Sequence, residues 1–280
     1  MRILKRITLG LIAVIVLAVL VIYAGSEWTI RRGRDVALTP ITVPHDAASI
    51  AEGGRLAKIT GCRDCHGKNG GGEVLVSNPM LGTIAPPALA RATAGYSDAE
   101  LDRAIRHGVR KDGSSLFVMP TQALTFLADD DAGRIIAWIR SLRPLPNDSL
   151  KTTHYGPLAR ALLLSGQVRP SVHPATVSVA TRPADIGNYF VSVSCAGCHR
   201  LHEAQPSDDG RQIVPALAPI AAAYDPVAFR TLLRTGVGAT KRDLGMMRVA
   251  AVGGLSVLTD VEIAAIQAYL TAEAAKVTAR

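Results

Sequence analysis

The first strong pattern along the chain is an uninterrupted apolar segment, residues 7–24, which contains no charged side chain. At a rise of about 1.5 Å per residue this segment would form a helix of roughly 27 Å, close to the hydrocarbon thickness of a bilayer. A secretory signal has a shorter apolar region followed by small residues, whereas the bulky Ile22 stands where a small residue is preferred. The pattern therefore favours an uncleaved transmembrane anchor over a cleaved signal peptide.

The flanks of this apolar segment predict its orientation. Residues 1–6 carry Arg2, Lys5 and Arg6 and are expected in the cytoplasm, so that the rest of the chain is exported. Residues 25–44 are expected to form an extended spacer above the membrane.

Beyond residue 44, apolar positions recur at helical spacing in two separate regions, and strand signals are sparse. Ser97 and Asp225 are suitable N-cap residues. The pattern predicts an all-α fold in which glycine- and proline-rich loops connect the helices. The predicted helices cover residues 49–61, 97–107 and 129–142 in the first region, and residues 186–194, 225–235 and a segment starting at Thr259-Asp260 in the second.

The two regions repeat one pattern, which indicates a duplicated domain. At a constant offset of 128 residues, Pro87 pairs with Pro215 and Met119 pairs with Met247. We refer to residues 45–143 as the first half and to residues 184–280 as the second half. A proline-rich linker, residues 144–183, joins them, and its segment 158–164 is expected to form a short helix packed on a domain.

Charge excludes one class of partner. The chain has a formal net charge of +8, but residues 1–34 contain six Lys or Arg and one Glu, a balance of +5. The remaining +3 is spread over residues 35–280, so nucleic-acid binding is not expected.

All four cysteines belong to two Cys-x-x-Cys-His motifs: Cys62, Cys65 and His66, and Cys195, Cys198 and His199. Two thiols at this spacing can add to the two vinyl groups of one haem, and the adjacent His can bind its iron. Zinc sites usually place their cysteine pairs about 12–20 residues apart, and a redox-active cysteine pair or a disulfide needs no adjacent His. The motifs therefore favour two covalently attached haems c, with zinc and redox sites as the alternatives.

Each half resembles a class I cytochrome c domain, with an N-terminal helix, the Cys-x-x-Cys-His motif, a Pro-Ala-Leu loop, a methionine loop and a last helix with an aromatic residue. The resemblance implies that His66 and His199 are proximal iron ligands. It also implies that the carbonyl groups of Pro87 and Pro215 accept hydrogen bonds from these imidazoles, with Pro86 as the alternative to Pro87.

The same resemblance implies that Met119 and Met247 are the distal iron ligands, with Met246 as the alternative to Met247. A thioether is a soft ligand that raises the potential of haem iron. The matched Arg106 and Arg234 are expected to cap either a haem propionate or a helix end.

Together these features predict an electron carrier rather than an enzyme, placed on the periplasmic side of a bacterial cytoplasmic membrane. The expected donor is a dehydrogenase or a quinol-oxidising complex, and the expected acceptor is an oxidase or a soluble cytochrome. Two alternatives stay open: an electron-accepting subunit of a periplasmic dehydrogenase, and a dihaem peroxidase-type enzyme with an open iron position.

Overall fold

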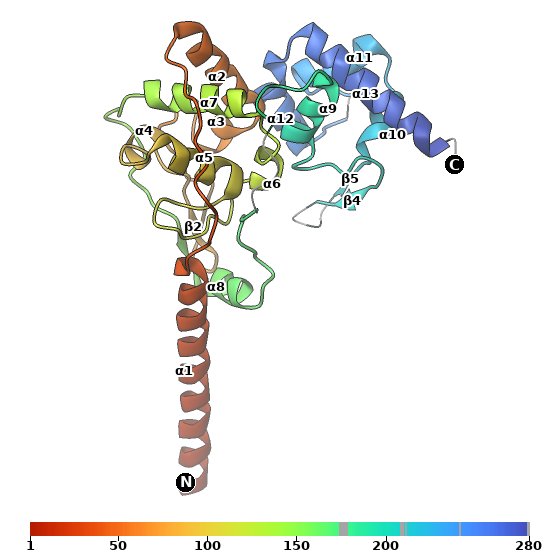
Figure 1. Cartoon of the computed structure of the whole chain (residues 1–280). Helices are drawn as coiled ribbons and strands as arrows, with labels where there is room; N and C mark the ends of the chain where they lie inside the picture. Colours follow the sequence, from red (N-terminus) through yellow and green to blue (C-terminus); the bar gives the residue numbers. More distant parts are fainter. Residues whose placement is uncertain (174–178, 208–209, 211, 241, 279–280) are drawn as a thin grey trace.

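The computed structural model describes residues 1–173, 179–207, 210, 212–240 and 242–278 (Figure 1). The chain is mostly helical, as predicted, and the described residues include five short strands, in keeping with the sparse strand signals. Linker positions 174–178 and positions 208, 209, 211, 241, 279 and 280 of the second half lie outside the described residues.

The helices before the linker are α1 (Arg2–Arg31), α2 (Ala47–Ile59), α3 (Cys62–Cys65), α4 (Leu89–Ala92), α5 (Asp98–His107), α6 (Thr121–Leu124) and α7 (Asp129–Ser141). The later ones are α8 (Pro157–Leu164), α9 (Ile186–Phe190), the π-helix η1 (Val191–Cys195), α10 (Leu217–Ala222), α11 (Pro226–Thr235), α12 (Met246–Gly253), the 3-10 helix η2 (Leu255–Val257) and α13 (Asp260–Thr278). The strands are β1 (Val76–Asn78), β2 (Gly82–Ile84) and β3 (His154–Tyr155), which form one antiparallel sheet, and β4 (Gln205–Pro206) and β5 (Ile213–Val214), which form another.

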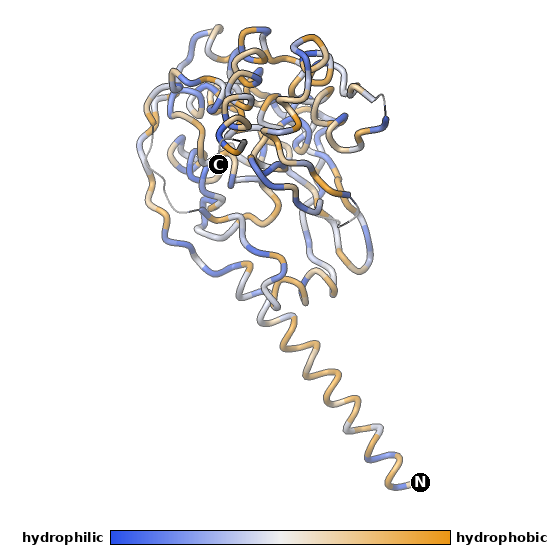
Figure 2. The backbone as a smooth tube through the Cα atoms, turned by 90° about the vertical axis from the view of Figure 1, so that its right-hand side faces the viewer, coloured by the Kyte–Doolittle hydropathy of each residue, from blue (hydrophilic) through white to orange (hydrophobic). Residues whose placement is uncertain are grey.

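Helix α1 projects from the body of the molecule as an apolar rod (Figures 1 and 2). It includes an 18-residue window with a mean hydropathy of 2.9 that is not buried inside the structure, so it is long and apolar enough to cross a bilayer. The helix continues to Arg31, and the prediction of an extended spacer was therefore wrong for residues 25–31. Those residues stay helical where α1 packs against α8 and Ser26 is fully buried.

The first half is organised around the crossing of α2 and α7. A Cβ atom on Gly53 would lie 1.8 Å from the carbonyl oxygen of Arg134, and one on Gly54 would lie 3.0 Å from the Trp138 ring. The missing side chains let the two helices approach closely. Because α3 follows α2 after two residues, this crossing also positions the first Cys-x-x-Cys-His motif.

The second half repeats this crossing between α9 and α13. A Cβ atom on Gly187 would lie 2.3 Å from the carbonyl oxygen of Ala265 and 2.9 Å from the Cβ of Tyr269. Ala265 and Tyr269 each stand 131 positions after Arg134 and Trp138, so both halves use equivalent residues of their last helix. The helix α9 passes directly into η1, which ends at the first cysteine of the second motif.

A second repeated contact joins the middle and last helices of each half. Arg106 of α5 forms an ion pair of 2.7 Å with Asp129, the first residue of α7. Arg234 of α11 forms an ion pair of 3.0 Å with Asp260, the first residue of α13. Each arginine also donates a hydrogen bond to a backbone carbonyl just before that helix. Arg106 and Arg234 therefore each cap the start of the last helix in their half, which is one of the two roles expected from the sequence.

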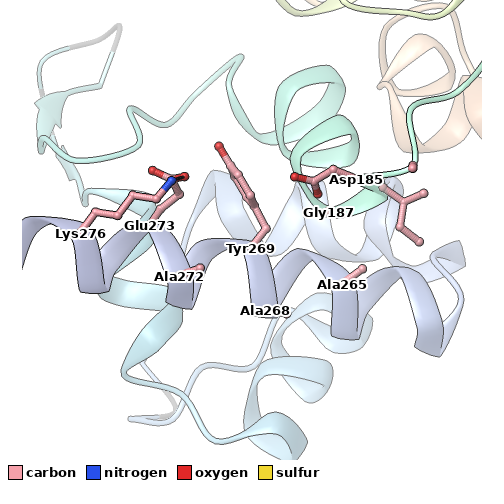
Figure 3. A pocket seen from close by; sticks show the side chains of 10 residues that line it. Asp185, Gly187, Ala265, Ala268, Tyr269, Ala272, Glu273 and Lys276 are labelled. Carbon is pink, nitrogen blue, oxygen red and sulfur yellow. Dashed lines mark hydrogen bonds and ion pairs between the residues drawn. The ribbon is translucent and has the colours of Figure 1, made fainter.

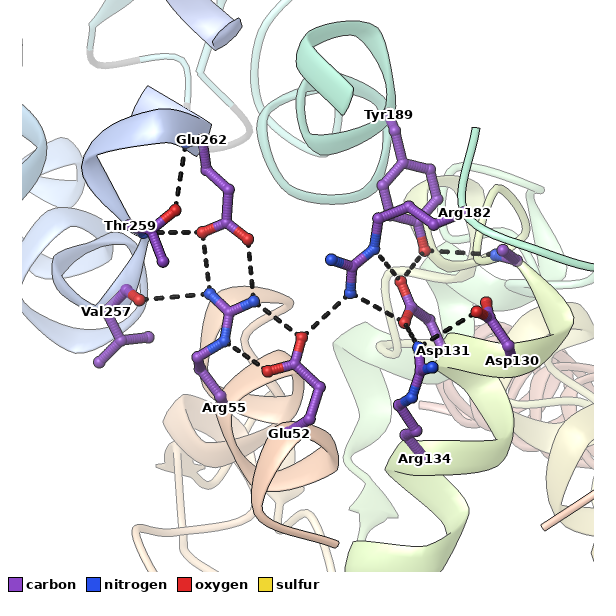
Figure 4. Close-up of polar contacts among 11 residues, drawn as sticks. Glu52, Arg55, Asp130, Asp131, Arg134, Arg182, Tyr189, Val257, Thr259 and Glu262 are labelled. Carbon is purple, nitrogen blue, oxygen red and sulfur yellow. Dashed lines mark hydrogen bonds and ion pairs between the residues drawn. The ribbon is translucent and has the colours of Figure 1, made fainter. Parts of the chain in front are cut away.

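Charged side chains join the two halves across their interface (Figure 4). Arg55 of α2 lies 2.7 Å from Glu52 and 2.8 Å from Glu262 of α13. The hydrogen bond from Arg55 lowers the pKa of Glu52 against the effect of burial. Burial by itself would raise the pKa of Glu262, but the hydrogen bonds from Arg55 and the Thr259 amide outweigh it and the pKa lies below its ordinary value.

The linker completes this charged interface through Arg182. Its guanidinium group lies 2.8 Å from Asp131, which is fully buried, and 3.0 Å from Glu52. The hydroxyl group of Tyr189 in α9 donates a hydrogen bond of 2.8 Å to Asp131. One buried carboxylate thus connects the first half, the linker and the second half.

Replacing Gly53 by Ala is expected to lower the free energy of unfolding by about 3 kcal/mol, because the new methyl group would overlap the α7 backbone. The gain in helix propensity, about 1 kcal/mol, acts in the opposite direction and is smaller. Denaturant unfolding followed by circular dichroism measures the change. At Gly33, a new Cβ meets nothing within 4 Å, so Gly33→Ala is the control, and equal effects at both positions would contradict the prediction.

The carboxylates paired with Arg55 should make stability depend on pH. Because their pKa values are lowered in the folded state, they contribute stability above about pH 4.3 and lose it as the pH falls through the folded values. We expect Arg55→Gln to cost about 2 kcal/mol at neutral pH and to flatten the loss of stability between about pH 5 and 3. Denaturant midpoints across this range provide the measurement.

Arg200→Gln is the matched control for this prediction. Its ion pair with Glu203 is exposed, with 61% and 74% of the two side chains accessible, so its loss should change stability by less than about 0.5 kcal/mol. A pH dependence of Arg55→Gln identical to that of the unmodified chain would refute the assignment.

Candidate functional site

The first Cys-x-x-Cys-His motif folds into the short helix α3, and His66 follows as its C-terminal cap. The Nδ1 atom of His66 lies 2.9 Å from the carbonyl oxygen of Pro87. The carbonyl of Pro86 instead accepts a hydrogen bond from the amide of Glu73. Of the two prolines considered from the sequence, Pro87 is therefore the one that faces the imidazole.

The second motif has the same local geometry. The Nδ1 atom of His199 lies 3.0 Å from the carbonyl oxygen of Pro215. The backbone amide of His199 donates to the carbonyl of Cys195, as the amide of His66 donates to that of Cys62. Two motifs separated by 133 positions in the sequence thus form one arrangement twice.

These contacts determine which imidazole nitrogen is available to a metal. A carbonyl oxygen can only accept, so Nδ1 carries the proton and donates, and Nε2 is the unprotonated nitrogen. Burial lowers the pKa of His66 and outweighs the opposing effect of its hydrogen bond to Pro87. The ring is therefore neutral at neutral pH, as a metal ligand requires, and its orientation is fixed by the carbonyl.

The cysteines are thiols rather than disulfides. Burial raises the pKa of Cys62, and it raises the pKa of Cys195 to about 11. Zinc sites bind thiolates, which such an environment disfavours. Within the described residues, no group of three or more His, Cys, Asp or Glu side chains converges on a metal position. The arrangement therefore argues against the zinc alternative.

The candidate distal methionines differ in exposure. Met119 and Met247 are both partly buried and pack against the hydrophobic core. Met246, in contrast, is 76% exposed. Of the two neighbouring methionines at the start of α12, Met247 is thus the one directed inward.

Each motif also lies against the methionine-bearing segment of the other half. A Cβ atom on Gly253, at the end of α12, would lie 2.7 Å from Oδ1 of Asp64 inside the first motif. Helix α6, which follows Met119, packs against η1, and the Cβ of Ala123 lies 3.9 Å from a Cβ built on Gly197 of the second motif. This packing of each motif on the other half was not predicted from the sequence. The small residues at positions 123 and 253, which permit a close approach, are the sequence feature that could have indicated it.

The residues at both sites fit a covalently attached haem. Each half provides two thiols on one short turn, an imidazole whose Nδ1 faces a prolyl carbonyl so that Nε2 is left for a metal, and a partly buried thioether. The prolyl carbonyl supplies the hydrogen bond that commonly orients a metal-binding histidine.

Other histidines and a surface groove lie outside these sites. His107 is buried, as a structural residue, and its Nδ1 has no hydrogen-bond partner among the described residues. His202 lies 3.4 Å from Glu273. A groove of about 400 Å³ lies beside the crossing of α9 and α13 (Figure 3), and neither motif contributes to its lining, which includes Asp185, Gly187, Ala265, Tyr269, Glu273 and Lys276.

Comparison with known proteins gives a family match for part of the chain. The family model described as cytochrome c matches residues 50–143. The chain is 29% identical over 259 residues to the fructose dehydrogenase cytochrome subunit of Gluconobacter japonicus, covering 81% of this chain and 53% of that protein.

Two further relatives are also named as cytochrome subunits of dehydrogenases. The chain is 27% identical over 195 residues to the cytochrome c subunit of a quinone-dependent alcohol dehydrogenase from Gluconacetobacter polyoxogenes, covering 64% of this chain and 41% of that protein. It is 26% identical over 183 residues to the gluconate 2-dehydrogenase cytochrome c subunit of Pantoea cypripedii, covering 58% and 42%. The chain spans about half the length of these relatives.

Proposed function

We propose that the whole chain is a membrane-anchored dihaem cytochrome c that transfers single electrons between redox proteins, with residues 50–143, which the cytochrome c family model matches, as its first haem domain. The observation that carries this proposal is the duplicated contact between a motif histidine and a prolyl carbonyl, at 2.9 Å and 3.0 Å. Equivalent helix crossings in the two halves support a second cytochrome c domain over residues 184–280.

In this proposal the chain holds each haem at fixed positions. A haem, when bound, supplies a one-electron couple between ferric and ferrous iron. Cys62, Cys65, Cys195 and Cys198 would make the thioether attachments, and His66 and His199, oriented by the carbonyls of Pro87 and Pro215, would bind the iron. Met119 and Met247 would supply the second iron ligand in each half. An iron that is bound by both an imidazole and a thioether would leave no position for a substrate, which favours a carrier over a dihaem peroxidase.

The contact between the halves supports electron transfer within one chain. Each thiol-bearing turn lies against the methionine-bearing segment of the other half, so the two sites share one interface. Arg55 and Arg182 hold that interface in a single arrangement through Glu52, Asp131 and Glu262.

The relatives favour a dehydrogenase as the electron donor. The three that we compared are cytochrome subunits of dehydrogenases for an alcohol, a sugar and a sugar acid. We therefore propose that the chain accepts electrons from a periplasmic dehydrogenase and passes them to an oxidase or a soluble cytochrome. A quinol-oxidising complex is the alternative donor.

We also propose that α1 remains attached as the anchor, with both haem domains in the periplasm. The helix runs without a break through residues 21–26, where a signal peptide would be cleaved, and its last turns pack on α8. A cleaved signal has no reason to contribute to the folded body in this way.

Two haems per chain are expected when the protein is produced together with haem-attachment enzymes. The intact mass and the haem content per protein measure the number. Cys62→Ala with Cys65→Ala should leave one haem, and Cys195→Ala with Cys198→Ala should leave the other. A single haem in the unmodified chain would contradict the dihaem proposal. In that case, the double variant that still carries one haem would identify the site that does not load, because its missing cysteines were not in use.

Methionine ligation is tested by the near-infrared absorption band from methionine sulfur to ferric iron. Met119→Ala and Met247→Ala should each remove about half of the band and lower the potential of one haem, because a soft ligand is lost. Met246→Ala is the matched control and should leave the band intact, since its side chain is exposed. Loss of intensity in Met246→Ala, with none in Met247→Ala, would assign the ligand to the neighbouring residue.

A further inference from the structure

We propose that α8 and the turn beside it form a second contact with the membrane, in the headgroup region next to the anchor. We call this surface the collar and define it as residues 79–81 and 157–164. The inference rests on the proposed role of α1 as an uncleaved anchor. Its partner is a lipid bilayer.

The collar lies at the outer end of the apolar span. A Cβ atom on Gly25 would lie 2.7 Å from a methyl group of Leu164, and Arg160 is 3.0 Å from the Ser26 hydroxyl and 2.9 Å from Glu27. The apolar span ends at residue 24, and each helical residue adds about 1.5 Å. These contacts on α1 therefore fall within about 5 Å of the edge of the hydrocarbon.

The turn at residues 79–81 is hydrogen-bonded directly to the start of α8. The amide of Leu158 donates to the carbonyl of Met80, and the amide of Gly156 donates to that of Leu81, each at 3.0 Å. Strand β3, just before α8, also pairs with β2. The turn and the helix therefore form one unit at the base of the first half, beside the outer end of α1 (Figure 1).

This unit presents large apolar side chains to the outside. Leu158 is 43% exposed, Leu164 is 40% exposed, and Met80 and Leu81 are 53% and 37% exposed. Grouped apolar side chains of this kind are unfavourable in water, and they mark a contact surface when they continue from another one. Here they continue from the apolar surface of α1, which identifies the bilayer as the partner.

The residues of α1 at this level fit the headgroup region. Tyr23 and Trp28 are 41% and 64% exposed, and aromatic side chains of this type gather at the interface between membrane and water. The guanidinium group of Arg32 lies over the Trp28 ring, and Arg31 is largely exposed. Basic side chains here favour anionic headgroups.

A second contact would fix the first half relative to the membrane. A single helix permits the attached domain to tilt and rotate, whereas two contacts joined by the ion pair of Arg160 with Glu27 restrict both motions. The collar would thereby hold the first haem site at a defined height above the membrane.

The test uses the full chain with its haems in vesicles of phosphatidylethanolamine and phosphatidylglycerol. Leu158→Cys and Met80→Cys each introduce one thiol for a nitroxide label, because haem attachment consumes the native cysteines. Val227→Cys is the matched control, since Val227 is apolar, 71% exposed and located on α11, far from the anchor (Figure 1). Electron paramagnetic resonance measures label collisions with oxygen and with a water-soluble nickel chelate.

The ratio of oxygen to nickel collisions should be several-fold higher at positions 158 and 80 than at position 227. Equal ratios would overturn the collar, and so would labels shielded from both reagents, which would indicate a protein partner. Val14→Cys in the anchor distinguishes the underlying proposals, because water access at that position would overturn the anchor and the collar together. More than one label per chain would mean that some native cysteines are free, which would contradict complete haem attachment. The collision ratios would still decide whether the collar contacts the membrane.

Discussion

Close contact between helix backbones is the constraint on which each half depends. Gly53 and Gly187 remove the side chain at the point where α2 meets α7 and where α9 meets α13. The Cys-x-x-Cys-His motif follows directly from the first helix of each pair, so the crossing sets the position of the thiols and the imidazole. A larger residue at either glycine would move the helix and with it the site. The requirement is steric and not chemical, because the backbone of α7 or α13 occupies the space that a Cβ atom would need.

The interface between the halves adds a second level of constraint. Arg55 pairs with Glu52 of the first half and Glu262 of the second half, and Arg182 of the linker pairs with Glu52 and Asp131 of the first half, all in a partly buried environment. Buried charges are costly unless they are paired, so this network favours one relative arrangement over others. The same arrangement places α12 on the first motif and α6 on the second. Two sites that are far apart in the sequence thereby become neighbours.

Much of the site could be predicted because its chemistry is local. Cys62, Cys65 and His66 are close in sequence, and a pattern of five residues is enough to indicate their joint use. The Pro87 carbonyl was inferred from a family resemblance, and the hydrogen bond to His66 agrees with it. Between Met246 and Met247 the repeat offset gave a preference, and side-chain exposure supplied an independent reason for it. The spacer was predicted incorrectly over residues 25–31, because their helical conformation depends on contacts with α8, more than 130 positions away.

The sequence by itself determined the elements whose cause lies within a few neighbouring residues. These are the apolar N-terminal helix, the capped amphipathic helices, the repeat and the two motifs, all of which follow from local periodicity and spacing. The tertiary structure decided which surfaces meet: the packing of each motif on the opposite half, the network around Asp131, and the docking of α8 on the outer end of α1. These contacts join residues from distant parts of the chain, and their stability comes from shape and charge complementarity that no local pattern encodes.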